Sequence, residues 1–338
     1  MLGKDHVFII AEAGVNHNGN IDIAKKLIDA ACKAGADAVK FQTFKAENLV
    51  TINAPKAEYQ KETTGTGNQF GMLKKLELSF EDHIYLKQYC DKKSIIFLST
   101  PFDFESVDLL EKIGVEYYKT SSGDLTNIPL LEYIAKLQKP MIVSTGMANL
   151  GEVEIAVKAI KKYMNKDLYL LHCTSNYPNM YEDVNLNAMN TLKSAFKVPV
   201  GYSDHTVGIE VPIAAVAMGA KIIEKHFTLD KFMEGPDHRA SLEPDKLKDM
   251  VDGIRNIEKA FGDGIKRCNE NEEKSKFVSR KSIVAKTNLK KGQKLSINNI
   301  AFKRPETGIS PIYTNIIIDK KITRDVNKDE FITLDLIE

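Results

Sequence analysis

Eight short apolar runs recur along the first two thirds of the chain, and amphipathic segments separate them. Most of the runs are almost continuously apolar, which is typical of strands that helices cover on both faces. The runs occupy residues 7–14, 36–43, 95–102, 117–124, 140–147, 168–175, 198–205 and 220–227. Because helical segments lie between them, the pattern predicts an α/β fold of the closed (β/α)₈ TIM-barrel type.

The segments between the runs carry apolar residues at helical spacing, as in 20–35, 106–114 and 149–164. The long interval after the second run differs, because residues 46–75 are polar and rich in Gly and Thr. We expect 46–75 to be a loop excursion over the catalytic face. A disordered surface loop is the alternative.

The C-terminal part of the chain has a different pattern. Residues 1–265 contain the predicted barrel, and the charge-dense stretch 266–277 has the composition of an exposed linker. Residues 278–338 show short β-type runs broken by turn signals such as "KKG" and "NKDE". The sequence therefore predicts a second, small β-rich domain over 278–338.

Charge and hydropathy exclude several classes of partner. The 47 basic residues nearly cancel the 46 acidic ones, so no overall field recruits nucleic acid or an anionic membrane. No apolar run approaches the roughly 20 residues of a membrane span, and the run before Glu12 is too short for a signal peptide. We expect a cytoplasmic protein.

Polar residues gather at the C-terminal ends of the eight predicted strands, which form the active-site face of such a barrel. One group has positive charge and neutral donors, as an anion pocket for phosphate or carboxylate requires. Its members are Lys40, Lys119, Ser122, Ser144, Asn176 and Ser203. Lys40 and Lys119 lie inside apolar runs, where an unpaired ammonium group is costly, which favours a binding role over a surface position.

A second group contains carboxylates and imidazoles. Its members are Glu12, Asp124, Glu224, Asp237, His205 and His226. His205 and His226 end neighbouring strands and could share a divalent cation, Mn²⁺ or Mg²⁺, that keeps positions open for water or substrate. Spacing alone leaves a structural role for either histidine equally open, and Asp204 between the groups has no assigned role.

A series of motifs in order resembles the sialic acid (N-acetylneuraminate / legionaminate) synthase family. These motifs are "AEAGVNHNG", "VKFQTF", "STPFD", "KTSSGD", "STGMA", "LHCTSNYP", "GYSDHT", "IEKHFTLDK" and "GPDHRASLEP". The tail, with "RKSIVAKTNLKKGQKL" and "FKRPETGIS", is similar to the antifreeze-like (SAF) domain that ends these enzymes. The resemblance implies a TIM barrel followed by a small SAF domain.

The resemblance also implies roles for the residues of both groups. His205 and His226 would bind the metal, and the six residues of the anion pocket would bind phosphoenolpyruvate. Gln42, Tyr177 and Arg304 would contact the sugar, with Arg304 reaching the partner subunit of a domain-swapped homodimer. The catalytic residues would be Glu12, Asp124, Glu224 and Asp237. Asp124 stands where bacterial members often carry Glu, so its reach is shorter.

The expected reaction condenses phosphoenolpyruvate with N-acetylmannosamine and water to give N-acetylneuraminate and phosphate, through a metal-activated aldehyde and C–O cleavage. The alternative sugar is 2,4-diacetamido-2,4,6-trideoxymannose, which would give N,N'-diacetyllegionaminate. A remoter alternative is another phosphoenolpyruvate-dependent 3-deoxy-sugar-acid synthase. An ice-binding role for the tail is disfavoured, because the tail is rich in lysine around "KTNLKKGQK".

Overall fold

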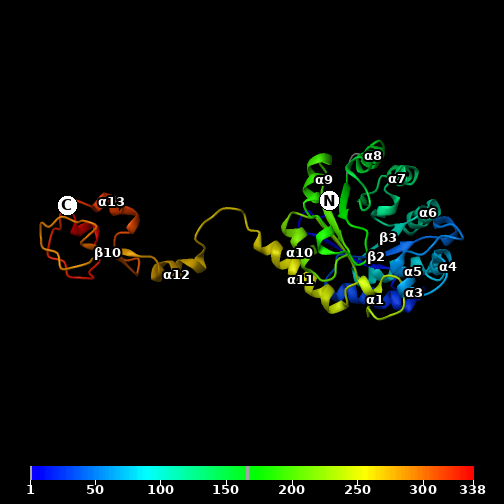
Figure 1. Cartoon of the computed structure of the whole chain (residues 1–338), viewed down its shortest axis with the longest axis horizontal. Coiled ribbons are helices and arrows are strands. Elements are labelled where there is room, and N and C mark those ends of the chain that lie inside the picture. Colours follow the sequence, from blue (N-terminus) through cyan, green and yellow to red (C-terminus); the bar gives the residue numbers. More distant parts are fainter. Residues whose placement is uncertain (1, 165–166) are drawn as a thin grey trace. The chain divides into compact units, whose positions relative to one another are not determined.

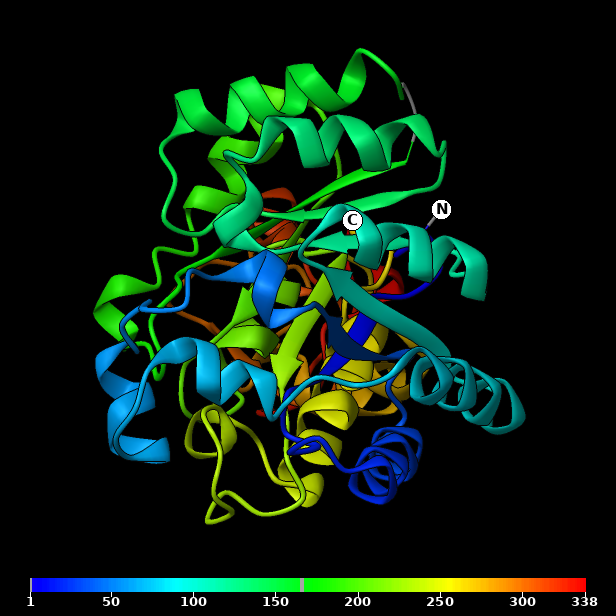
Figure 2. The same cartoon turned by 90° about the vertical axis from the view of Figure 1, so that its right-hand side faces the viewer.

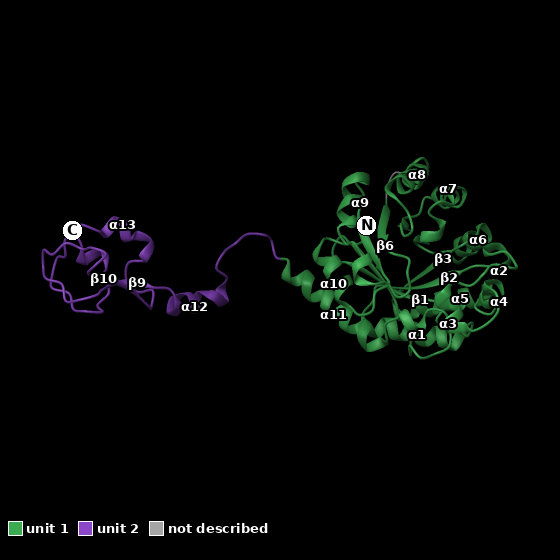
Figure 3. Ribbon diagram, in the orientation of Figure 1, with its two compact units in different colours: residues 1–261 green, residues 262–338 purple. Residues whose placement is uncertain are grey.

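The computed structural model describes residues 2–164 and 167–338. The chain divides into two compact units, residues 1–261 and 262–338 (Figure 3). The first unit contains one parallel sheet of eight strands with helices around it (Figures 1 and 2). The strands are β1 (Phe8–Gly14), β2 (Ala38–Thr43), β3 (Ile96–Pro101), β4 (Tyr118–Thr120), β5 (Met141–Ser144), β6 (Leu168–Cys173), β7 (Val200–Asp204) and β8 (Ile222–His226).

Each predicted strand contains an observed one, and the predicted TIM barrel is confirmed. The hydrogen-bonded order is β3-β2-β1-β8-β7-β6-β5-β4, and contacts between β3 and β4 close the barrel where the described strands have no ladder bonds. The fourth run is shorter than the predicted 117–124. It turns after Thr120 because the Ser121 hydroxyl accepts a hydrogen bond from Asp124 N, which starts the 3₁₀ turn η1 (Ser122–Asp124).

Successive side chains of each strand point to opposite faces of the sheet, and this produces two separate apolar layers. In β1, Phe8 and Ile10 belong to the cluster inside the barrel, together with Leu98 and Leu171 of other strands. Ile9 belongs to the larger cluster between the sheet and the helices. This second layer explains why the runs read as continuously apolar, because both faces of the sheet are covered.

The eight helices that cover the sheet are α1 (Ile21–Ala34), α5 (Phe80–Lys93), α6 (Phe104–Ile113), α7 (Ile128–Lys136), α8 (Leu150–Lys161), α9 (Ala188–Phe196), α10 (Glu210–Ala217) and α11 (Pro244–Ala260). Several begin at side-chain caps, such as Asn20 for α1 and Ser79 for α5. α1 ends at Gly35, whose φ of 83° suits glycine. The loops also contain η2 (Tyr181–Asp183) and η3 (His238–Ala240).

The excursion predicted at 46–75 contains three short helices that its polar composition did not reveal: α2 (Ala46–Leu49), α3 (Glu58–Thr64) and α4 (Gln69–Lys74). Lys56 organises this segment. Its buried Nζ donates to Thr64 Oγ1 at 2.9 Å and to the carbonyl oxygens of Gly65 at 3.1 Å and Thr66 at 3.3 Å. The long ammonium side chain therefore holds the end of α3 and the turn after it together.

The second unit is small and has its own core. Its elements are α12 (Glu270–Ser279), β9 (Ser282–Ala285), β10 (Ile300–Lys303), η4 (Pro311–Tyr313), α13 (Thr314–Ile317) and η5 (Leu334–Leu336). β9 and β10 pair antiparallel, and Ile283, Leu295 and Ile332 are among the buried residues. Part of the predicted linker 266–277 is helical, because Asn269 caps α12. Among the described residues no helix is long and apolar enough to cross a membrane.

Candidate active site

Four charged side chains meet inside the barrel at the C-terminal ends of its strands. Glu12 and Lys40 are directly opposite each other on β1 and β2, Lys119 is in β4, and Glu224 is in β8. All four are at least 95% buried. Because their charges alternate in sign, each charge has an opposite one beside it, which offsets the cost of removing it from water.

The distances show how this cluster is connected. Lys40 Nζ lies 2.8 Å from Glu12 Oε2 and 3.6 Å from Glu224 Oε2, and Lys119 Nζ lies 3.5 Å from Glu224 Oε1. Neutral hydroxyl groups complete the shell: Lys40 donates to Thr100 Oγ1 at 3.0 Å, and Lys119 donates to Ser144 Oγ at 2.7 Å. Two ammonium groups and nearby hydroxyls form a site that can receive a phosphate or a carboxylate.

The two glutamates differ in ionisation. Burial raises the pKa of Glu12 to about 7, against the lowering effect of Lys40. Burial also opposes ionisation of Glu224, but the ammonium groups of Lys119 and Lys40 and the hydroxyl of Ser203, which donates at 2.9 Å, hold its pKa at about 2. Glu224 is therefore ionised at neutral pH, whereas Glu12 can gain or lose a proton near neutral pH.

Two serines and a glycine lie together on the segments that follow β4, β5 and β6. Ser122 Oγ accepts a hydrogen bond from Gly146 N at 3.0 Å. A methyl group at position 146 would clash with the hydroxyls of Ser175 and Ser122, so both hydroxyls lie against Gly146. The structure thus brings Ser175 to this group, whereas the predicted Asn176 is exposed. Strand alternation gave no signal for Ser175, because β6 ends at Cys173 and the chain then turns.

The two histidines lie together, with ring centroids 5.3 Å apart. His205 Nδ1 is 2.8 Å from the carbonyl oxygen of Thr174, which can only accept, so Nδ1 carries a proton and Nε2 is the ring nitrogen left for a cation. His226 Nδ1 is buried without a hydrogen-bond partner and lies 3.9 Å from Asp237 Oδ2. A buried nitrogen without a partner and an imidazole oriented by a carbonyl suit a divalent cation.

The protonation state of His226 is compatible with binding of a cation. Burial, together with the neighbouring His205, lowers the pKa of His226 well below its usual value, so its ring is in the neutral form that binds metals. Among the described residues no three His, Cys, Asp or Glu side chains are arranged to hold an ion by themselves. A cation held by this pair would therefore need water or substrate oxygens to complete its coordination.

An aromatic wall borders the histidines. The ring of Tyr177 lies 4.2 Å from that of His205 and meets the ring of His226 edge-on at 5.7 Å, centroid to centroid. Tyr59, in α3, stacks on Tyr177 at 5.4 Å. The excursion at 46–75 thus reaches the catalytic face, as predicted, but Tyr59 itself had not been singled out.

The other predicted residues are placed as follows. Gln42 Nε2 donates to Glu12 Oε1 at 3.3 Å, which puts Gln42 at the edge of the cluster. Asp124 accepts hydrogen bonds from Ser121 Oγ at 2.6 Å and from Asn127 Nδ2 at 3.4 Å, so its carboxylate supports its own turn. Arg304 belongs to the second unit, where it is exposed directly after β10.

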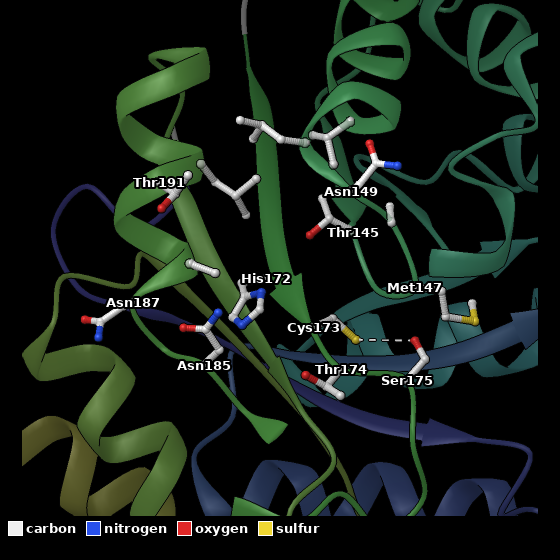
Figure 4. Close-up of a pocket in the computed structure, with 15 residues that line it drawn as sticks. Thr145, Met147, Asn149, His172, Cys173, Thr174, Ser175, Asn185, Asn187 and Thr191 are labelled. Carbon is white, nitrogen blue, oxygen red and sulfur yellow. Dashed lines mark hydrogen bonds between the residues drawn. The ribbon is translucent and has the colours of Figure 1, made fainter. Parts of the chain in front are cut away.

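A cavity lined by polar and apolar side chains adjoins the serine group. It has a volume of about 570 Å³ and lies between the segments that follow β5 and β6 (Figure 4). Figure 4 shows Thr145, Met147 and Asn149 on one side and Asn187 and Thr191 on the other. The cavity is lined by neutral groups, so it is chemically distinct from the charged cluster in the barrel.

Comparison with known proteins agrees with this geometry. Residues 27–266 match the model of the NeuB family. The chain belongs to the NeuB family. Residues 280–338 match the SAF domain, which confirms the nature of the second unit. The NeuB-family chain is thus an enzyme, a phosphoenolpyruvate-dependent transferase that forms a carbon–carbon bond.

Two curated relatives and one solved structure illustrate the family. The chain is 53% identical to N,N'-diacetyllegionaminic acid synthase of Campylobacter jejuni, over 96% of this chain and 98% of the relative. It is 48% identical to the protein of the same name from Legionella pneumophila, over 95% and 91%. The N-acetylneuraminic acid (sialic acid) synthetase of Leptospira borgpetersenii, solved with citrate, has a TM-score of 0.70 and 40% identity, with 80% of this chain and 90% of that chain covered.

Proposed function

We propose that this NeuB-family protein condenses phosphoenolpyruvate with 2,4-diacetamido-2,4,6-trideoxymannose and water, giving N,N'-diacetyllegionaminate and phosphate. The observation that carries the choice of sugar is the identity of 53% and 48% to two N,N'-diacetyllegionaminic acid synthases over nearly the whole chain. The buried cluster of two lysines and two glutamates supports the choice of an anionic co-substrate.

In this proposal Lys40 and Lys119 hold the phosphate and carboxylate of phosphoenolpyruvate. Their ammonium groups are buried and only 3.5–3.6 Å from Glu224, so an entering anion meets positive charge that is already oriented. The hydroxyls of Ser122, Ser144 and Ser175 add neutral donors around it. Charge-assisted hydrogen bonds of this kind hold an anion firmly in a site with little water.

We assign the divalent cation, Mn²⁺ or Mg²⁺, to His205 and His226, with Asp237 beside them. When bound, the cation supplies Lewis acidity at the aldehyde oxygen of the open-chain sugar. Tyr177 and Tyr59 form the adjacent wall, and their rings orient the sugar so that its aldehyde carbon faces the enol carbon of phosphoenolpyruvate. Holding two reactants in this geometry lowers the barrier to the carbon–carbon bond.

When the methylene carbon of phosphoenolpyruvate forms the new bond to the aldehyde carbon, positive charge develops on the neighbouring carbon, which carries the phosphate. Glu224, which stays ionised, lies between the lysines and stabilises this charge. Water then adds to that carbon, and the C–O bond to phosphate breaks as the ketone forms. One proton of the water ends on the new hydroxyl and the other on the departing phosphate.

Glu12 is the carboxylate that we assign to proton transfer. Its pKa of about 7 lets it accept a proton from the attacking water and release it again at neutral pH. Gln42 orients the Oε1 atom of Glu12 by its hydrogen bond. Asp124, whose oxygens are bound within its own turn, is better suited to supporting the loop that carries Ser122.

The second candidate sugar is N-acetylmannosamine, which would give N-acetylneuraminate. The likeness to the sialic acid synthetase of Leptospira borgpetersenii, at 40% identity, supports it. The higher identity to the two legionaminic acid synthases makes the diacetamido sugar the better supported substrate, in contrast to our first expectation.

The deciding experiment measures phosphate release from phosphoenolpyruvate with each of the two sugars, side by side, in the presence of Mn²⁺. We expect kcat/KM to be at least about 10-fold higher with the diacetamido sugar, which corresponds to about 1.4 kcal/mol of differential transition-state binding. Mass spectrometry of the product identifies the acid formed. Equal or faster turnover of N-acetylmannosamine would contradict the choice of sugar, and no phosphate release with either would contradict the reaction.

A further inference from the structure

A buried ion pair lies directly behind the two histidines. Asp204 Oδ2 and Lys225 Nζ are 2.5 Å apart, and neither side chain has any exposed surface. Asp204 precedes His205 and Lys225 precedes His226 in the sequence. The two charged residues are also direct partners in the parallel register of β7 and β8. The pair therefore joins the two strand ends that carry the histidines.

The Asp204–Lys225 pair does not point into the barrel interior, where the reaction is proposed to take place. Ser203 and Glu224 are the preceding partners in the same register, and they meet inside the barrel through a hydrogen bond of 2.9 Å. Because successive side chains of a strand point to opposite faces, Asp204 and Lys225 point away from that interior. The reacting atoms and this ion pair thus lie on opposite sides of the sheet.

Asp204 and Lys225 both form hydrogen bonds with Thr206, the residue that follows His205. Asp204 accepts from Thr206 N at 3.1 Å and from Thr206 Oγ1 at 2.9 Å, and Lys225 donates to the carbonyl oxygen of Thr206. Tyr202 OH donates to the other oxygen of Asp204 at 3.0 Å. The backbone on both sides of His205 is therefore tied to the residue that precedes His226.

Burial of two charges is not explained by stability alone. A buried pair costs a desolvation energy that its attraction often only offsets, and apolar replacements of similar volume are frequently neutral or stabilising. Every side-chain polar atom of this pair has a partner, so none is left for a substrate. What the pair does provide is a fixed distance between two strand ends.

We propose that Asp204 and Lys225 are positioning residues that set the separation of the His205 and His226 rings, and with it the affinity for the divalent cation. This inference rests on the proposed function, which places the cation at the two histidines. Partners behind metal ligands typically change metal affinity about 10- to 100-fold when they are lost. The pair acts through the backbone and through the β7–β8 register, without touching the cation.

The test is Mn²⁺ binding to the metal-free full-length protein, followed by the electron paramagnetic resonance signal of free Mn²⁺ and without any substrate. The variant Asp204→Asn/Lys225→Met removes both charges at similar volume, which avoids an unpaired buried charge. We expect its dissociation constant for Mn²⁺ to rise at least about 10-fold while the protein stays folded by circular dichroism.

The chain offers a matched control at the other end of the barrel. Arg255 of α11 and Asp37, which precedes β2, form an ion pair of 2.8 Å, and Asp37 also accepts from Ile9 N. Asp37→Asn/Arg255→Met therefore removes a pair that ties barrel elements together far from the histidines. We expect this variant to bind Mn²⁺ as the wild type does, even where its unfolding temperature falls.

The outcomes separate the two ideas. A dissociation constant within twofold of wild type in folded Asp204→Asn/Lys225→Met, or an equal rise in the control, overturns the positioning role and leaves the proposed function intact. A wild-type protein that binds no Mn²⁺ overturns the metal assignment and this inference together. If the double variant does not fold, Thr206→Val decides, because it removes only the hydroxyl contact to Asp204; an unchanged affinity then refutes the inference.

Discussion

Glu12 and Glu224 have the same side chain and share Lys40, yet their environments give them opposite tasks. Glu224 lies between two ammonium groups and stays ionised, whereas burial leaves Glu12 with a pKa of about 7. Two carboxylates whose pKa values are driven apart are a frequent arrangement for acid–base chemistry. The sequence predicted both residues as catalytic, but it could not divide the roles, because these depend on which charges surround each carboxylate.

A prediction at the residue scale concerns the loop after β6. Ser175→Ala should lower kcat/KM for phosphoenolpyruvate about 10-fold, because a hydroxyl beside Gly146 and Ser122 would donate to the substrate anion and such a bond contributes about 1.5–3 kcal/mol. Its neighbour Asn176 is exposed and provides the matched variant. Steady-state phosphate release at varied phosphoenolpyruvate checks both, and a larger loss for Asn176→Ala would restore the assignment expected from the sequence.

Helices and strands could be predicted from the sequence where their burial produces a regular pattern of apolar residues. Eight apolar runs predicted eight strands, since burial on both faces imposes an apolar residue at almost every position. The helices within 46–75 were missed, because their order depends on contacts such as that of Lys56 with the carbonyl oxygens after α3. The ion pair of Asp204 and Lys225 was missed for a related reason: it requires the register of β7 against β8.

The short helix α3 gives the prediction at the element scale. It supplies Tyr59, which stacks on Tyr177 next to the histidines. Tyr59→Ala should change the ratio of kcat/KM values for the diacetamido sugar and N-acetylmannosamine about 10-fold, because an aromatic face contacts the methyl end of a 6-deoxy sugar more favourably than a hydroxymethyl group.

The control for this prediction is Tyr85→Ala, which removes an exposed tyrosine of α5. Both variants lose an aromatic ring, but only Tyr59 lies at the proposed sugar site. If Tyr59→Ala lowers turnover of both sugars by the same factor, then Tyr59 only stabilises the segment and does not select the substrate.

The whole molecule consists of two units with separate cores, a catalytic barrel and an SAF domain. The expected homodimer, in which Arg304 of one subunit contacts the sugar in the other, is a proposal at this scale. It follows from the resemblance to the family. Arg304 is exposed directly after β10, a position that another subunit could reach.

We predict that Arg304→Ala raises KM for the sugar at least about 10-fold and leaves KM for phosphoenolpyruvate unchanged, since it removes one charge-assisted contact to the sugar alone. Lys303→Ala, the adjacent cation, which pairs with Asp329 inside the same unit, is the control. Mixing Arg304→Ala with a barrel variant that lacks activity should restore turnover if the residue acts in the partner subunit. Unchanged kinetics in Arg304→Ala would remove the idea.

The seam of the barrel, where the described strands β3 and β4 meet without ladder hydrogen bonds, would give bound substrate a role in stabilising the fold. The strand ladder starts at β3 and ends at β4, so β4, which carries Lys119, contacts β3 without ladder hydrogen bonds between the described residues of the two strands. Lys40 stands on β2, on the far side of β3 from that edge. In the proposed function, phosphoenolpyruvate held by both lysines would therefore connect β2 to β4 across this seam, inside the barrel. Bound phosphoenolpyruvate would then stabilise the attachment of β4 to the rest of the barrel, and the release of phosphate would remove this stabilisation.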